Sequence, residues 1–270
     1  MSTKKFQRTW IPKPKEQDFD WLQIKTFELM IADSFHYRNS KTFLEVFPKY
    51  RDDVVNLFNS PFDDLTPTHG KENNKHYRKI STDEINKAFR KRLSKISDIH
   101  LEVSYMDGYL YDNKDKTKGF DFAYYDTELN AKRFHDYCFG HRSISNGEEQ
   151  WTNFVSEQRG QEYLSCQSLE RSYYENFEIN AESIPTIVGE IQFANWALGY
   201  YDLFKVLHLD NLTGIDLLIY ITPTRTLEKK LSSNIVTFDN MKKIIETYSS
   251  VLKVPIWLVG IDIKDPLSNK

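Results

Sequence analysis

The chain has 270 residues, 40% of them hydrophobic and 14% aromatic, which is enough for one large domain or for a core with an accessory region. No run of about 18 apolar residues occurs, so no membrane span is predicted, and the basic N-terminus lacks the apolar run of a secretory signal. The two cysteines, Cys138 and Cys166, are too few for a disulfide scaffold. We therefore expect a soluble, cytoplasmic protein with no membrane partner.

The net charge of −3 does not itself indicate nucleic-acid binding, but the charges are unevenly distributed. Residues 1–15 carry five Lys or Arg and no acid, and residues 71–98 carry nine Lys or Arg against four Asp or Glu. This pattern is typical of a phosphate-binding face on an acidic body. A solvated helix with a disordered tail would give the same pattern.

The N-terminal part of the chain is predicted to be mostly helical. Residues 1–20 resemble an extended arm, residues 21–60 have apolar residues at helical spacing, and residues 60–80 contain turn-forming residues. Ser81 and Glu84 form a capping-box pattern that predicts a helix, and the basic residues Lys87, Arg90 and Lys91 lie largely off its apolar stripe. We interpret residues 1–98 as a basic, helical region that contributes to DNA binding.

Residues 99–270 are predicted to form the core. Alternating residues predict strands at 100–105 and 120–125, while residues 130–172 are ambiguous. A hairpin of strands 174–179 and 184–193 follows, then a helix at 196–207, a strand at 214–222, a helix ending at 252 and a strand at 254–263. The order β-hairpin, α, β, α, β predicts an α/β fold with a mixed central sheet flanked by helices.

The polar pair Glu190 and Gln192 stands out on an apolar strand. Residues two apart on a strand point to the same face, so these side chains project together, away from Ile191 and Phe193. A carboxylate is costly to bury unless it is paired, hydrogen-bonded or bound to a cation. The pattern therefore favours a metal ion, and Mg²⁺ prefers a few carboxylates with water and phosphate oxygens.

A second acid is needed to complete this site. Glu178 lies on the preceding predicted strand and reaches Glu190 if the hairpin 174–193 pairs in that register. Because a slip of one residue would reverse the faces, Glu175 and Glu182 are alternatives, and Glu170 is a further one.

The segment VGEIQFANWALGYYDLFKVL resembles the catalytic core of the PD-(D/E)XK nuclease superfamily. It is most similar to the BglII/BstYI-like type II restriction endonucleases, in which an E-x-Q replaces the usual E-x-K and precedes a phenylalanine, a small residue and a helix. Glu190, Gln192 and Phe193 match that pattern. The family also implies an aspartate ahead of the E-x-Q, and none lies between Asp136 and Glu190, which leaves Glu178 as the substitute.

The resemblance implies a restriction-endonuclease-like core and Mg²⁺-dependent hydrolysis of double-stranded DNA at a short specific site, by a homodimer. Glu178 and Glu190 would hold the metal ion, and Gln192 would orient water or stabilise developing charge. It also implies a restriction-modification context.

Several basic residues are candidates for DNA contact. Arg142 and Arg159 lie in segments that resemble base-reading loops, and phosphate contacts are predicted at Arg171, Lys205, Lys229 and Lys230. Three alternative functions remain open at this point. They are a DNA-binding protein without catalysis, favoured by the missing aspartate, a repair or structure-selective nuclease, and a glycosidase with two carboxylates.

Overall fold

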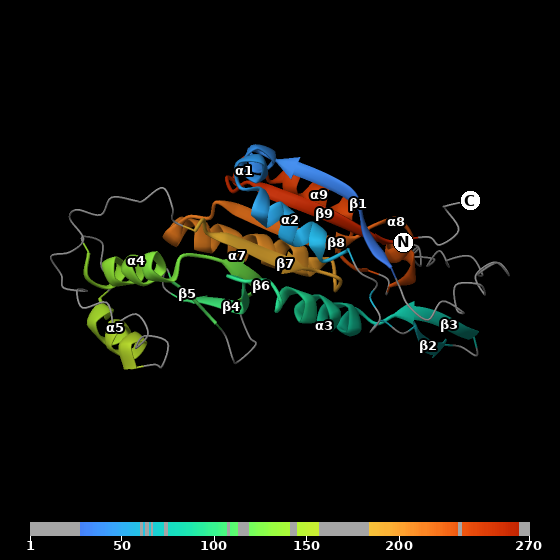
Figure 1. Ribbon diagram of the computed structural model, residues 1–270, viewed down its shortest axis with the longest axis horizontal. Helices are drawn as coiled ribbons and strands as arrows, with labels where there is room; N and C mark the ends of the chain where they lie inside the picture. The colour runs from blue at the N-terminus through green and yellow to red at the C-terminus, as the bar shows by residue number, and fades with distance from the viewer. Residues whose placement is uncertain are drawn as a thin grey trace, which may run out of the picture.

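A central seven-stranded sheet organises the computed structural model (Figure 1), with strand order β1-β9-β8-β7-β6-β4-β5. The structure describes residues 28–59, 62, 65, 67–72, 75–106, 109–112, 119–140, 145–156, 184–231 and 234–264. The strands of the sheet are β1 (Leu29–Tyr37), β4 (His100–Met106), β5 (Tyr109–Asp112), β6 (Gly119–Tyr124), β7 (Ile187–Ile191), β8 (Leu217–Pro223) and β9 (Ile256–Ile263).

The sheet is mixed, as the element order predicts. β7, β8 and β9 run parallel to one another, and every other pair is antiparallel. The parallel strands are buried along nearly their whole length, which explains their apolar, β-branched sequences. Helices α7 (Ala197–Thr213) and α9 (Phe238–Thr247) lie in the two crossovers, because parallel neighbours need a long connection.

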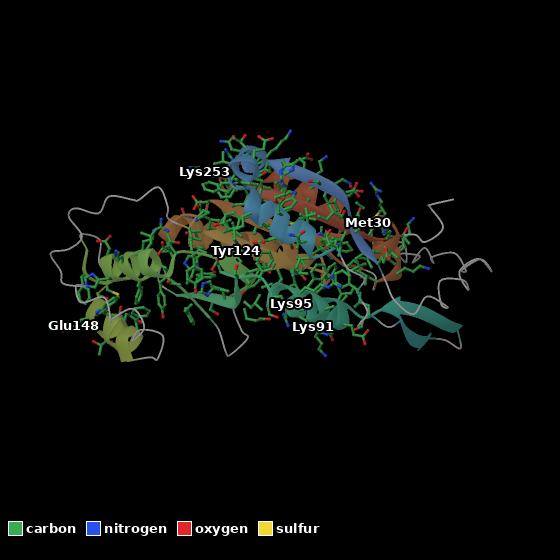
Figure 2. All side chains as sticks on the ribbon, in the orientation of Figure 1. Met30, Lys91, Lys95, Tyr124, Glu148 and Lys253 are labelled. Atoms are coloured by element: carbon green, nitrogen blue, oxygen red, sulfur yellow. The ribbon has the colours of Figure 1, made fainter. Side chains whose placement is uncertain are left out.

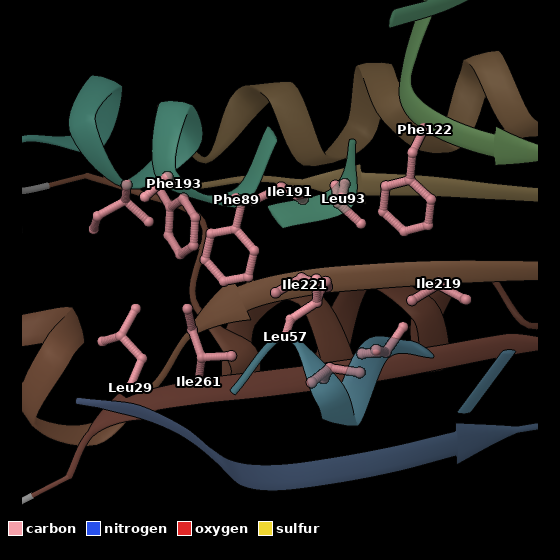
Figure 3. Packing of buried hydrophobic residues seen from close by; sticks show 14 of the residues in the cluster. Leu29, Leu57, Phe89, Leu93, Phe122, Ile191, Phe193, Ile219, Ile221 and Ile261 are labelled. Carbon is pink, nitrogen blue, oxygen red and sulfur yellow. The ribbon is translucent and has the colours of Figure 1, made fainter. Parts of the chain in front are cut away.

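Helices cover both faces of the sheet. On one face, α1 (Ser40–Val46), α2 (Pro48–Asn56), α3 (Thr82–Leu93) and α8 (Arg225–Lys230) contribute to a single apolar cluster. Figure 3 shows part of this cluster, in which the rings of Phe89 on α3 and Phe193 after β7 lie 6.2 Å apart between centroids. On the other face, α7 and α9 pack with Val188 and Tyr220 in a second cluster.

Two smaller units extend from this core. Helices α4 (Thr127–Phe139) and α5 (Gly147–Ser156) pack with Tyr109 of β5 in a separate apolar cluster. Strands β2 (Pro67–Glu72) and β3 (Lys75–Ile80) form a two-stranded antiparallel sheet. Across the described residues, no helix combines the length and the apolar character that crossing a membrane requires.

The N-terminal region differs from the prediction in two places. Residues 29–37, predicted to be helical, form β1, which pairs with β9 at the edge of the central sheet. The helical prediction fails here because pairing with an apolar strand overrides local spacing. Residues 67–80, interpreted as a loop, contain the β2–β3 hairpin. A division of the chain at residue 98 remains a prediction.

The neighbours of β7 also differ from the predicted hairpin. β6 occupies one edge of β7 and β8 occupies the other, so the antiparallel partner of β7 is residues 119–124 and not residues 174–179. The hairpin prediction paired strands that are adjacent in sequence, whereas this sheet joins strands separated by α4, α5 and a further segment. Residues 174–183 lie outside the described part of the chain.

Candidate active site

Glu190 is a buried carboxylate near the end of β7. Its side chain points to the α7 face, whereas Ile187, Ile191 and Phe193 belong to the cluster on the opposite face. Glu190 is 5% exposed and lies beside Tyr220 of β8 in the parallel register. The prediction that Glu190 projects away from its apolar neighbours is therefore confirmed.

Asp121 on β6 lies next to Glu190 across the two strands. Phe122 pairs with Gly189, so one step further along both strands brings Asp121 opposite Glu190. At that step the Asp121 carboxylate, through Oδ2, accepts a hydrogen bond from the backbone N–H of Ile191 at 2.7 Å. This contact fixes a carboxylate beside Glu190 where the regular ladder ends.

Helix α7 brings a buried ion-pair network against Glu190. The ammonium of Lys205 donates to the Glu190 carboxylate, and it lies 3.1 Å from Oδ1 of Asp202. It also donates to the backbone carbonyl of Gly119 at 2.8 Å. Asp202 is 2% exposed and its Oδ2 accepts the hydroxyl of Tyr220 at 2.9 Å.

Gln192 is held at both ends of its amide. Its Nε2 donates to Oδ2 of Asp202 at 2.9 Å, and its Oε1 accepts the backbone N–H of Ala194 at 3.1 Å. Its own backbone N–H continues the β7–β8 ladder by donating to Ile221. The amide is therefore oriented, with one Nε2 proton remaining beyond the bond to Asp202.

A second cation lies on the other side of Asp121. Arg90 of α3 pairs through Nε with Glu102 at 2.6 Å and through Nη2 with Asp121 at 3.5 Å. Glu102 lies beside Asp121 on β4 and has a left-handed backbone with φ of 52°. A non-glycine residue in this region is uncommon, so the strand is locally irregular at the site.

The pKa values of the site reflect burial first and the neighbouring charges second. Burial raises the pKa of Glu190 well above its usual value, and the carboxylates of Asp202 and Asp121 raise it further, against the opposing effect of Lys205. Burial also raises the pKa of Asp121, although the Ile191 N–H and Arg90 oppose this. Burial lowers the pKa of Lys205, but Glu190 and Asp202 outweigh it and the net shift is upward.

This arrangement fits a divalent cation. Four carboxylates, those of Glu102, Asp121, Glu190 and Asp202, share two cationic side chains, those of Arg90 and Lys205. If all were ionised the cluster would carry two negative charges, which a divalent cation would balance. Within the described ranges, no three acidic, His or Cys side chains converge as a metal-binding group. Mg²⁺ is commonly held by one or two carboxylates together with water and phosphate oxygens.

The structure places some of the predicted site residues, and others lie outside the described ranges. Glu190 and Gln192 lie together as expected, each bonded to the α7 network. Lys205, predicted to contact phosphate, is only 7% exposed and points inward. Several predicted residues lie outside the described part of the chain, namely Glu178 with its alternatives Glu175, Glu182 and Glu170, and Arg142, Arg159 and Arg171.

The basic residues of α3 are split between two environments. Lys87 and Lys91 are exposed, as is Lys95 just beyond the end of the helix (Figure 2), whereas Arg90 turns its guanidinium to the Asp121 carboxylate. Ile85 and Phe89 bury the opposite side of the helix, as the apolar stripe predicts.

Asp121, Asp202 and Tyr220 were not among the site residues predicted from the sequence. A signal for Asp121 existed, because it is the one charged residue in the apolar strand GFDFAY. For Asp202 the signal was a polar residue three before Lys205, among the buried positions Leu203 and Val206 of α7. Neither pattern reveals the contacts with β7 and β8, because Ile191, Gln192 and Tyr220 lie on other elements.

Comparisons with known proteins identify a family that matches most of the chain. The family model described as restriction endonuclease BglII/BglIII matches residues 32–261. The crystal structure of restriction endonuclease BglII complexed with a DNA 16-mer aligns at 12% identity and a TM-score of 0.47, covering 84% of this chain and 74% of that chain. Free BglII aligns at 12% identity and a TM-score of 0.38, covering 86% and 79%.

A search of curated protein sequences gives no match. The family model spans most of the chain, from β1 to β9. The chain therefore belongs to the BglII/BglIII restriction endonuclease family.

Proposed function

We propose that this protein is a type II restriction endonuclease that uses Mg²⁺ to hydrolyse phosphodiester bonds of double-stranded DNA at a short specific site. The proposal rests on the position of Asp121 beside Glu190, one step beyond the last β6–β7 pair, with Gln192 two residues further along the chain. The membership of the chain in a restriction endonuclease family supports the same proposal.

Asp121 and Glu190 are the residues that we propose to hold the metal ion. Bound there, Mg²⁺ would polarise the scissile phosphate and lower the pKa of a coordinated water. Asp121 takes the role that the sequence analysis gave to Glu178, because it lies opposite Glu190 on the strand that pairs with β7. The Ile191 N–H fixes the Asp121 carboxylate in place.

Gln192 is proposed to orient rather than to transfer a proton. An amide does not titrate near neutrality, so Gln192 cannot act as the general base. Its Nε2 keeps one proton beyond the bond to Asp202, and this proton can hold the attacking water or donate to the charge that develops on phosphate oxygens.

DNA contact is assigned to the basic residues of α3 and to loops. Lys87 and Lys91 are exposed on the same helix whose Arg90 reaches Asp121, so a phosphate bound along α3 would lie near the proposed active site. Arg90 therefore belongs both to the proposed DNA-binding helix and, through its contact with Asp121, to the proposed active site. Arg142, Arg159 and Arg171 remain predicted DNA contacts.

A homodimer is proposed from the surface of α7. Leu198, Tyr201 and Phe204 recur every three residues and are 39%, 48% and 70% exposed, which gives one side of α7 an apolar stripe. The same helix contributes Lys205, whose ammonium lies 5.4 Å from the centroid of the Tyr201 ring. A second copy covering this stripe would place two active sites in one assembly, as cleavage of both strands of a palindrome requires.

The non-catalytic alternative rested on the lack of an upstream aspartate. Asp121, which lies beside Glu190, offers an acid that does not come from the segment just before β7, and this supports the catalytic alternative. A repair or structure-selective nuclease would share this site, so the substrate is what separates it from the proposed function.

The experiment is digestion of plasmid and phage DNA by the purified protein with Mg²⁺ or with EDTA. We expect discrete fragments with Mg²⁺ alone, and sequencing of their ends gives the site. A smear would instead indicate a nonspecific or structure-selective nuclease. Intact DNA with every divalent metal tested, together with retained DNA binding, would establish the binding-protein alternative.

A further inference from the structure

The ammonium of Lys205 lies at the centre of a buried network behind Glu190 and Gln192. An ammonium has three N–H donors, and three acceptors surround this one, namely Glu190, Asp202 and the carbonyl of Gly119. Its side chain is 7% exposed, so the charge is held almost entirely by these partners.

Asp202 connects this ammonium to the second polar residue of β7. Its Oδ1 faces Lys205, while its Oδ2 accepts both Gln192 Nε2 and the Tyr220 hydroxyl at 2.9 Å. Asp202 and Lys205 are three residues apart, so a single face of α7 carries both groups. Tyr220 of β8 pairs with Glu190 of β7, so its hydroxyl joins the network from the side of the sheet.

Stability alone gives little reason for such a network. A buried ion pair is often no more stabilising than apolar residues of similar volume, because removing charges from water is costly. The Leu203, Val206 and Leu209 side chains of α7 already supply apolar packing. What Asp202 and Lys205 add is a fixed geometry at Glu190 and Gln192.

We infer that Asp202 and Lys205 are positioning residues of the proposed nuclease site, with Lys205 orienting the Glu190 carboxylate and Asp202 orienting the Gln192 amide. Strand β7, which carries Glu190, contains no Lys or Arg, and the ammonium that contacts the Glu190 carboxylate comes from Lys205 on α7. This inference rests on the proposed function. It adds that one face of α7 holds the Glu190 carboxylate and the Gln192 amide in position.

The test compares Lys205→Met and Asp202→Asn with wild type in single-turnover DNA cleavage over a range of Mg²⁺ concentrations. Partners that orient metal ligands usually contribute about 10–100-fold to metal affinity or activity, so we expect losses of that size. Binding of the same DNA in Ca²⁺ should stay within about 3-fold of wild type, since neither side chain is exposed to DNA.

The two substitutions should be strongly non-additive. If both residues act through one network, the Lys205→Met/Asp202→Asn double variant should lose little more than the worse single variant. Tyr220→Phe removes only the hydroxyl bond to Asp202, so it is the mildest variant and should give a smaller loss of rate with a near wild-type fold. Lys243→Met, at an exposed lysine of α9, is the matched control and should cleave like wild type.

Thermal unfolding of each variant separates positioning from folding. A loss of rate per folded molecule, with DNA binding retained, supports the inference. Wild-type rates in Lys205→Met and Asp202→Asn, or losses that only follow the folded fraction, would overturn it while leaving the nuclease assignment intact. A wild-type protein that cleaves no DNA would overturn both.

Discussion

The carboxylate of Asp121 accepts the backbone N–H of Ile191 at 2.7 Å, although the two residues are 70 positions apart in the sequence. β6 and β7 pair up to Phe122 and Gly189, and at the next step this side chain takes the N–H in place of a backbone carbonyl. The contact brings Asp121 beside Glu190 where the two strands separate. The site thus depends on the close approach of β6 and β7.

Gly189 permits that approach, and adding a methyl group there should destabilise the fold. A Cβ at Gly189 would lie 2.0 Å from Cζ of Phe122, whose ring is completely buried. Overpacking of this kind costs about 1–3 kcal/mol, so Gly189→Ala should lower the Tm by several degrees. Differential scanning calorimetry measures the change.

Gly199→Ala is the matched control for that substitution. Gly199 lies within α7, and the nearest atom to an added Cβ is Sδ of Met241 at 3.4 Å. Alanine is the better helix former by up to about 1 kcal/mol, so this variant should be as stable as wild type or more stable. A stable Gly189→Ala protein would show that β6 and β7 are not packed so closely.

The contact of Asp33 with α8 should make stability depend on pH in the acid range. Burial acts to raise the pKa of Asp33, but hydrogen bonds from Arg225 and Thr224 outweigh it and the net shift is downward. A lowered folded-state pKa stabilises the fold above the unfolded value of about 4, and this contribution is lost as the pH falls through the folded value.

Asp33→Asn should therefore be less stable than wild type at pH 7, with a difference that shrinks below about pH 4. Urea unfolding at pH 7 and pH 3 measures both quantities. Asp52→Asn, at an exposed pair with Arg51, provides a comparison in which little change is expected. A difference for Asp33→Asn that grows on acidification would contradict the assignment.

The apolar stripe of α7 should control the oligomeric state. Phe204 is 70% exposed, and a charge placed there would be buried in the proposed dimer without a partner. We expect wild type to sediment as a dimer at micromolar concentration and Phe204→Glu to sediment as a monomer. Val46→Glu changes an exposed residue of α1, on the other face of the sheet, and should leave the dimer intact. A monomeric wild type would exclude this interface.

Binding of Mg²⁺ should raise the Tm through Glu190. A ligand present at 100 times its Kd stabilises the folded state by about 2.7 kcal/mol. We expect a measurable upward shift for wild type and little or none for Glu190→Gln, which lacks the charge. The shift induced by the metal is compared within each protein, because the substitution itself changes the starting stability. Equal shifts in both proteins would place the metal elsewhere.

The C-terminal half of the fold could be predicted because its patterns are local. The buried strands β8 and β9, and helix α9 between them, appear in the sequence as apolar runs and an amphipathic stripe. β1 was missed because the helical spacing of apolar residues between 21 and 30 was extended over residues 29–37, and only pairing with β9 decides between the two structures.

The candidate site was half predictable for the same reason. Glu190 and Gln192 stand two apart on one strand, so their shared direction follows from strand geometry. Asp121 belongs to another strand, and α4 and α5 separate it from β7 in the chain. Which strands become neighbours depends on long-range pairing, which no local pattern in the sequence specifies.

The role of Asp121 in catalysis is tested by comparing DNA cleavage by Asp121→Asn with cleavage by wild type and by the control Asp136→Asn, which changes an exposed aspartate of α4. All three proteins are assayed with Mg²⁺ and with EDTA, and DNA binding is measured in Ca²⁺. We predict that wild type and Asp136→Asn give the same discrete fragments with Mg²⁺. Asp121→Asn should bind DNA but cut it at least about 100-fold more slowly, the scale lost with one preorganised electrostatic group. Cleavage by Asp121→Asn at the wild-type rate would contradict the pairing of Asp121 with Glu190 as the catalytic centre.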